Sequence, residues 1–134
     1  MTQKDKELLL KDLCARLPYG VKISTHNGSQ TTVGIICTNG GGKVYTSNML
    51  YNISQVKPYL RPMSSMTEEE RRELLSFGAI TRLENGEVID VSCVGFDNHA
   101  IVQDYLNSHH FDYRNLIEKG LAIAVTEENN PYNE

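Results

Sequence analysis

The fold class of this chain follows from residues 21–56, VKISTHNGSQTTVGIICTNGGGKVYTSNMLYNISQV. Apolar and polar residues alternate over much of this segment, with the period of two that is typical of strands. Asn27-Gly28 is a hairpin signal, and the glycine-rich segment 39–42 marks the next turn. The predicted strands are residues 21–25, 31–38, 43–47 and 52–56. Short strands joined by tight turns predict an antiparallel meander or a small, partly open barrel.

The first hairpin has two candidate registers. A two-residue loop would place Ile23 opposite Thr32, and a three-residue loop over residues 27–29 would place Ile23 opposite Val33. We favour the second, because a slip of one residue would move apolar side chains to the wrong face of the sheet.

The segment before the strands predicts a helix over residues 3–17. Thr2 can cap its start, with Asp5 three positions later. The apolar stripe of this helix consists of Leu9, Leu10, Leu13, Cys14 and Leu17. The three cysteines of the chain are Cys14, Cys37 and Cys93. Because their number is odd and they lie far apart, we expect reduced, buried thiols rather than disulfides.

Residues 57–66 contain two prolines and are predicted to form an ordered, extended connector. A second helix begins after Thr67, because Thr67 and Glu70 have the spacing of a capping box, and Gly78 ends it.

A second hairpin is predicted around Asn85-Gly86, with Leu83 opposite Val88 and Ile80 opposite Val91. The remaining predicted elements are a helix over residues 98–109 capped by Asp97, a short helix over residues 113–118 and a strand over residues 121–125.

The short helix after Asp112 is predicted to be held by one local cluster of Phe111, Leu116 and Leu121. Beyond it, the polar tail 126–134 is expected to be frayed. Helices and strands in this order predict a single α+β domain over residues 1–125, with a helix at its start and short helices toward its end.

Charge limits the classes of partner. The 134 residues carry 13 Lys and Arg against 17 Asp and Glu, a net charge of −4. A general nucleic-acid binder needs a basic excess, which this chain lacks. It also has no apolar run of the length that a membrane span or a signal peptide requires, so we expect a cytoplasmic protein without membrane attachment.

No motif for catalysis or cofactor binding is complete. The segment 39–43, NGGGK, lacks the first glycine and the Ser or Thr of a phosphate-binding loop. His99, His109 and His110 lack the spacing of a zinc site. We therefore expect no metal and no cofactor. An enzyme of unknown reaction stays an alternative, because folding can bring distant catalytic residues together.

Three segments carry a family resemblance. They are residues 8–22 (LLLKDLCARLPYGVK), 56–70 (VKPYLRPMSSMTEEE) and 105–123 (YLNSHHFDYRNLIEKGLAI). They resemble a family of small uncharacterised proteins of gut anaerobic bacteria, their phages and their prophages. The resemblance implies an intracellular protein of a phage or mobile element and implies no particular activity. The chain departs from the family pattern at Tyr105, where Trp is expected, and in the tail after Val125.

Two segments are rich in residues that commonly anchor protein interfaces. The candidate interaction residues are Tyr59, Leu60, Arg61, His109, His110, Tyr113 and Arg114. An alternative for Arg61 is that an internal carboxylate holds it, in which case its role is structural.

The function that these observations favour is binding to a protein partner, for example a protein of a host cell. A nucleic-acid-associated protein is the alternative, with Tyr45 and Tyr51 stacking on bases from the β-rich region. The oligomeric state is left open.

Overall fold

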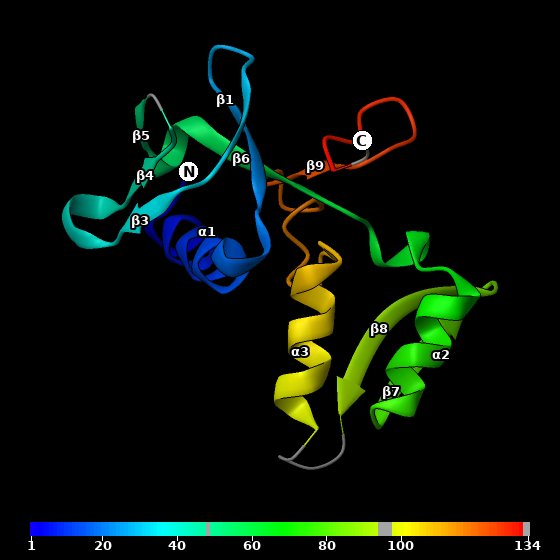
Figure 1. Ribbon diagram of the computed structural model, residues 1–134. Coiled ribbons are helices and arrows are strands. Elements are labelled where there is room, and N and C mark those ends of the chain that lie inside the picture. Colours follow the sequence, from blue (N-terminus) through cyan, green and yellow to red (C-terminus); the bar gives the residue numbers. More distant parts are fainter. Residues whose placement is uncertain (48, 94–97, 133–134) are drawn as a thin grey trace. The chain divides into compact units, whose positions relative to one another are not determined.

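The computed structural model describes residues 1–47, 49–93 and 98–132 (Figure 1). The chain divides into two compact units. Unit 1 comprises Met1–Leu60 and Arg114–Glu134, and unit 2 comprises Arg61–Tyr113. Both units combine helices with antiparallel strands, which confirms the α+β class. The single domain predicted over residues 1–125 thus contains two compact units.

Unit 1 contains one α-helix, short 3-10 helices and seven strands among its described residues. They are α1 (Gln3–Arg16), η1 (Leu17–Tyr19), β1 (Lys22–Thr25), β2 (Gln30–Thr32), β3 (Ile35–Cys37), η2 (Asn39–Gly41), β4 (Lys43–Tyr45), β5 (Leu50–Asn52), η3 (Ile53–Gln55), β6 (Val56–Leu60) and β9 (Ile123–Ala124). The strands form two open sheets, in the orders β2-β1-β6-β9 and β3-β4-β5. Of the two predicted arrangements, the described strands therefore form open sheets and do not close into a barrel.

Helix α1 starts as predicted. The Thr2 hydroxyl accepts a hydrogen bond from the Asp5 amide, and the Asp5 carboxylate accepts one from the Thr2 amide. Leu9 and Leu13 are fully buried in the core of unit 1. Cys14 is exposed, so the prediction of a buried thiol is wrong at this position. The helix buries the ion pair of Asp12 and Arg16 on its inner side instead.

The remaining members of the unit 1 core come from both sheets and from the segment after unit 2. They are Val21, Ile23, Val33, Val44, Tyr51, Ile53, Val56, Leu60, Leu116, Leu121 and Ala122. A single core under two sheets explains why strands of only two to five residues are stable here.

The register of the first hairpin differs from both predicted alternatives. Ile23 lies opposite Thr31, and the Val33 amide donates to the Val21 carbonyl. The Thr25 amide donates to the Ser29 carbonyl, so the loop consists of residues 26–28. The favoured register is therefore wrong by two residues, a shift that keeps Val21 and Val33 on the core face.

The segment predicted as a connector over residues 57–66 is a strand in its first part. β6 pairs with β1 on one side and with β9 on the other. Pro58 lies opposite Ile23 within this strand. Pro58 has no amide proton to donate to a neighbouring strand. It is tolerated here because β9 pairs with Tyr59 and Leu60 and not with Pro58.

Unit 2 contains two α-helices and a hairpin among its described residues. They are η4 (Met63–Ser65), α2 (Glu68–Ser76), β7 (Ala79–Glu84), β8 (Glu87–Cys93) and α3 (His99–Ser108) (Figure 1). The capping box of Thr67 and Glu70 is present as predicted, and Gly78 follows α2 with a φ of 92°. The core of this unit consists of Leu74, Ala79, Val102, Tyr105, Leu106 and Phe111. The predicted cap Asp97 lies outside the described residues.

The hairpin of unit 2 follows the predicted register at its tip only. Leu83 lies opposite Val88, as predicted. A register shift beyond Leu83 leaves Ile80 opposite Ser92 rather than Val91. The shift places Ile89 outside the ladder, as in a β-bulge, and a bulge has no local sequence signature in this hairpin.

The short helix predicted over residues 113–118 does not form. The segment consists of turns, with Asn115 at a φ of 59°, which is incompatible with a continuous helix. The expected cluster is also wrong, because Phe111 belongs to the core of unit 2 whereas Leu116 and Leu121 belong to the core of unit 1. Gly120 ends these turns with a φ of 75°, in the left-handed region that glycine adopts readily.

The tail expected to be frayed is attached at Tyr132. Its hydroxyl donates to the Tyr59 carbonyl at 2.8 Å and accepts from the Lys22 amide at 3.0 Å. Burial raises the pKa of Tyr132 to about 12. Both contacts are to the backbone of the sheet that contains β1 and β6, so the Tyr132 side chain joins the tail to this sheet.

Candidate functional site: an apolar outer sheet face

The β3-β4-β5 sheet of unit 1 is apolar on both faces. Each of its strands carries two consecutive apolar residues, which are Ile35-Ile36, Val44-Tyr45 and Leu50-Tyr51. Successive side chains in a strand point to opposite faces, so one residue of each pair faces inward and the other outward. Val44 and Tyr51 are buried in the core, with exposed fractions of 0% and 4%.

The outward residues form one continuous row. Ile35 pairs with Tyr45, and Tyr45 pairs with Leu50, so the three side chains are direct cross-strand neighbours. Their exposed fractions are 64%, 39% and 49%, and Met49 beside them is 50% exposed. We call Ile35, Tyr45 and Leu50 the outer-face row. Scattered apolar residues are ordinary on a surface, but a contiguous group indicates a binding site.

The next row on the same face is polar and almost uncharged. It consists of Cys37, Lys43 and Asn52, which are again paired across the three strands. The Lys43 ammonium donates to the Asn52 side-chain oxygen. Lys43 is the single charged residue in these three strands. The outer face therefore combines an apolar row with one positive charge.

Turns at both ends hold this sheet in place. The Gly34 amide donates to the Tyr45 carbonyl at 2.8 Å, and the Thr46 amide donates to the Met49 carbonyl at 2.9 Å. Gly42 has a φ of 100°, and a Cβ there would lie 2.8 Å from a methyl group of Leu10. Only glycine allows this turn to pack so closely on α1.

The predicted interaction residues of unit 1 are mostly held inside it. Tyr59 is 6% exposed, and its hydroxyl accepts from the Gln30 amide group at 3.1 Å. Leu60 is fully buried. Arg114 donates to Asp12 at 2.8 Å, and its side chain is 12% exposed. None of these three described side chains offers the open surface that the interface prediction requires.

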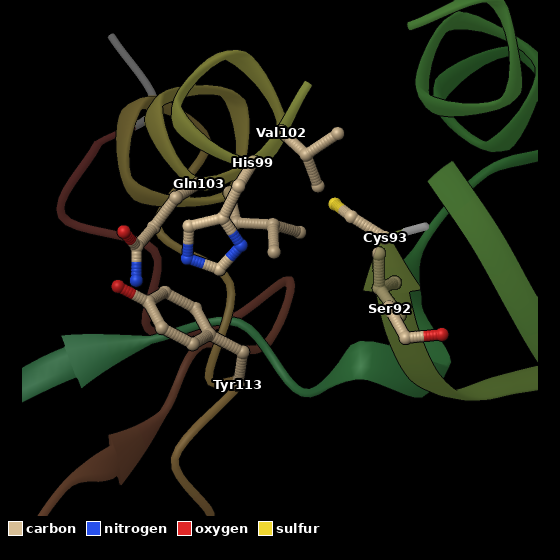
Figure 2. A pocket seen from close by; sticks show the side chains of 8 residues that line it. Ser92, Cys93, His99, Val102, Gln103 and Tyr113 are labelled. Carbon is tan, nitrogen blue, oxygen red and sulfur yellow. The ribbon is translucent and has the colours of Figure 1, made fainter. Parts of the chain in front are cut away.

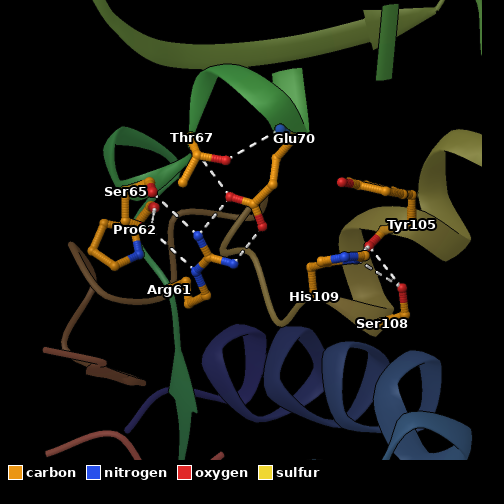
Figure 3. Close-up of polar contacts among 8 residues, drawn as sticks. All are labelled: Arg61, Pro62, Ser65, Thr67, Glu70, Tyr105, Ser108 and His109. Carbon is orange, nitrogen blue, oxygen red and sulfur yellow. Dashed lines mark hydrogen bonds and ion pairs between the residues drawn. The ribbon is translucent and has the colours of Figure 1, made fainter. Parts of the chain in front are cut away.

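Arg61 is held by a carboxylate of its own unit. Its guanidinium donates to both oxygens of Glu70, at 2.7 and 2.8 Å, and also to the Ser65 carbonyl at 3.1 Å (Figure 3). The guanidinium carbon lies 4.2 Å from the centre of the Phe111 ring, a cation–π arrangement. The alternative that an internal carboxylate fixes Arg61 is therefore confirmed.

The second candidate segment, which begins at His109, forms backbone hydrogen bonds with Arg61. The Arg61 amide donates to the His110 carbonyl at 2.7 Å, and the Asp112 amide donates to the Arg61 carbonyl at 2.8 Å. His109 stacks on Tyr105 with ring centres 4.0 Å apart. The Tyr113 hydroxyl donates to Asn107 at 2.7 Å. These contacts bring Arg61 and residues 109–113 together as part of the fold of unit 2.

Two pKa values in this cluster are shifted. Burial alone would raise the pKa of Glu70, but the hydrogen bonds from Arg61 and from the Thr67 backbone outweigh it and lower that pKa. Burial raises the pKa of Tyr105 to about 12, and the nearby carboxylates of Glu73 and Glu70 contribute. At neutral pH, Glu70 is therefore ionised and Tyr105 is neutral.

A small cavity of about 110 Å³ lies between β8 and α3 in unit 2 (Figure 2). Figure 2 shows the Cys93 thiol directed toward Val102, while the His99 ring lies beside Gln103 and Tyr113. Within the described residues, the thiol and the imidazole form no hydrogen bond with each other.

In the part of the chain that the structure describes, no three His, Cys, Asp or Glu side chains gather into a group that could hold a metal ion. Across residues 1–47, 49–93 and 98–132, none of the helices combines the length and apolar character needed to cross a bilayer.

The sequence did carry a signal for the outer-face row. Two adjacent apolar residues in each short strand break the alternation that a half-exposed sheet requires. Tyr45 is predicted as a base-stacking residue, whereas Ile35 is predicted only as a strand residue and Leu50 lies outside the predicted strands. Comparisons with protein-family models, with curated proteins and with solved structures find no match for this chain.

Proposed function

We propose that this chain binds a protein partner through the outer face of the β3-β4-β5 sheet. The observation that carries the proposal is the continuous row of Ile35, Tyr45 and Leu50, exposed on a sheet whose other face is buried. Covering such a row removes apolar area from water, which contributes about 25 cal/mol per Å². Tyr and Met are also enriched where proteins meet.

The composition of this face specifies the chemistry of the partner. Lys43 is the single charge in its strands, so it can match one acidic group at the edge of an otherwise apolar surface. A partner of this kind is a protein rather than a polyanion. The nucleic-acid alternative loses support, because Tyr51 is 4% exposed and is not available to stack on a base.

The cellular setting belongs to the same proposal. The resemblance to phage and prophage proteins supports a role inside a bacterial cell, with a host protein as the partner. The described cysteines are free thiols, which is compatible with a reducing compartment. In this proposal, the chain is an interaction protein of a phage or mobile element.

Capture of the partner with matched variants tests the proposal. The full-length protein is used as bait in a lysate of anaerobic host cells, beside Leu50→Thr and Ile80→Thr. Leu50 and Ile80 are both strand residues with an exposed fraction of 49%, but Ile80 lies in unit 2. We expect one protein to be captured by the wild type and by Ile80→Thr, and to be lost with Leu50→Thr.

Two results would overturn the proposal. One is capture that Leu50→Thr leaves unchanged, which would place the partner elsewhere. The other is a dimer in analytical ultracentrifugation that Leu50→Thr dissociates, because the outer face would then be occupied by a second copy of the chain. Thermal melts of both variants establish that each remains folded.

A further inference from the structure

A cavity of about 210 Å³ lies in unit 1, on a different sheet from the outer-face row. It is formed where β1 ends and where η3 leads into β6. The residues that line it are Ser24, Thr25, His26, Ser54, Gln55, Val56 and Lys57. None of these residues carries a carboxylate, and two of them can carry a positive charge. A cavity of this composition favours an anion.

Strand pairing makes the donors of this cavity converge. Ser24 lies directly opposite Lys57, so their side chains stand next to each other on the same face of the sheet. His26 lies in the turn after β1 and also lines the cavity. The His26 ring also lies edge-on to Tyr51, with ring centres 6.0 Å apart, and this contact restricts its orientation.

Four donors of the cavity are available to a ligand. Within the described residues, no hydrogen bond or ion pair occupies the hydroxyls of Ser24 and Ser54, the imidazole of His26 or the ammonium of Lys57. The other two polar residues are engaged. Thr25 accepts from the Ser29 amide at 3.2 Å, and Gln55 accepts from the Asn52 amide at 2.9 Å. Hydrogen bonds of the fold thus hold Thr25 and Gln55, and the four other polar groups lie among the residues that line the cavity.

We propose that this cavity binds the phosphoryl group of a small phosphate-bearing molecule. One ammonium, two hydroxyls and an imidazole N–H can supply donors to several oxygens of one tetrahedral anion. The volume is below the 300–1,000 Å³ that is typical of pockets for larger ligands, so the cavity suits the phosphoryl group rather than a whole nucleotide. This site is independent of the protein-binding face.

Nuclear magnetic resonance of the ¹⁵N-labelled full chain tests this site, with inorganic phosphate as the probe at constant ionic strength. We expect saturable shifts confined to the amides of residues 24–26 and 54–57. Lys57→Met should weaken phosphate binding at least about tenfold, the effect of losing one charge-assisted hydrogen bond. Ser54→Ala should weaken it about threefold and provides a second variant with a smaller structural change.

Lys4→Met is the matched control, because Lys4 is an exposed lysine on α1 and its loss changes the net charge equally. It should leave phosphate binding unchanged. The proposal is overturned if the two lysine variants have equal effects, if the shifts do not saturate, or if acetate binds as tightly as phosphate. The last result would assign the cavity to carboxylates instead.

Discussion

Arg61 shows how a residue that resembles an interface anchor can serve the fold. Its guanidinium is bound by both oxygens of Glu70 and stacked on Phe111, and its side chain is 23% exposed. We predict that Arg61→Ala lowers the free energy of unfolding by about 2–3 kcal/mol, because Glu70 then loses the partner of a half-buried charge. Denaturant unfolding measures the loss, and partner capture should survive it. An unchanged midpoint with loss of the partner would instead make Arg61 a contact residue.

Phe111 belongs to the same cluster and is fully buried. Phe111→Ala should destabilise the protein by about 3–5 kcal/mol, because it removes a core ring and leaves a cavity. Leu75→Ala, at a position that is 40% exposed, is the control and should change stability by less than about 0.5 kcal/mol. Equal denaturant midpoints for these two variants would show that the Phe111 ring is not part of the core.

Glu70 adds a dependence on pH. Its pKa is lowered in the folded state from an ordinary value of 4.5, so its ionised form stabilises the fold above that value. This contribution is lost as the pH falls through the folded-state pKa. We predict that Glu70→Gln is less stable than the wild type at pH 7 and loses less stability between about pH 5 and pH 3. Parallel curves of stability against pH for the two proteins would refute the assignment.

At the scale of elements, local signals were sufficient where a few neighbouring residues determine the structure. The capping boxes at Thr2 and Thr67 and the tip of the Asn85-Gly86 hairpin depend on contacts within three or four residues, and all were predicted. Residues 57–60 of the strand Val56–Leu60 were predicted as part of a connector, because their pairing partners lie far away in the sequence. The prediction of a buried Cys14 thiol was wrong for a similar reason. The buried side of α1 carries Asp12 and Arg16, and this ion pair depends in part on the distant residue Arg114.

The tail is a further element whose structure depends on a distant contact. Tyr132→Phe removes the hydrogen bonds to Tyr59 and Lys22 but keeps the ring. We predict a loss of about 1 kcal/mol in stability and faster amide hydrogen exchange over residues 126–132. Tyr45→Phe is the control, because its hydroxyl is on the exposed sheet face. Unchanged exchange in the tail of Tyr132→Phe would show that Tyr132 does not anchor it.

At the scale of the whole molecule, the two units differ in charge. Unit 1 carries nine Lys and Arg against seven Asp and Glu, whereas unit 2 carries four against ten. The net charge of −4 is therefore the sum of the charges of a weakly basic unit 1 and a strongly acidic unit 2. Both proposed sites, the outer-face row and the anion cavity, belong to unit 1. The acidic unit 2 repels polyanions, which agrees with a protein rather than a nucleic acid as the partner.

The candidate site was harder to predict than the fold class, for a physical reason. Ile35, Tyr45 and Leu50 become one surface only when three strands pair in a particular register. The adjacent apolar pairs in each strand were visible in the sequence, but which member of a pair faces outward depends on the core beneath. The predicted interaction residues were chosen by residue type, which does not distinguish a surface anchor from a buried support such as Tyr59.

The binding role of the outer face is tested most directly by calorimetry with the captured partner. The dissociation constant is measured for the wild type, Leu50→Thr and Ile80→Thr, which alter residues of equal exposure in the two units. We predict that Leu50→Thr weakens binding at least about tenfold, as expected for an anchor residue, and that Ile80→Thr leaves the constant within about twofold. Equal dissociation constants for wild type and Leu50→Thr would contradict the assignment of this face as the binding site.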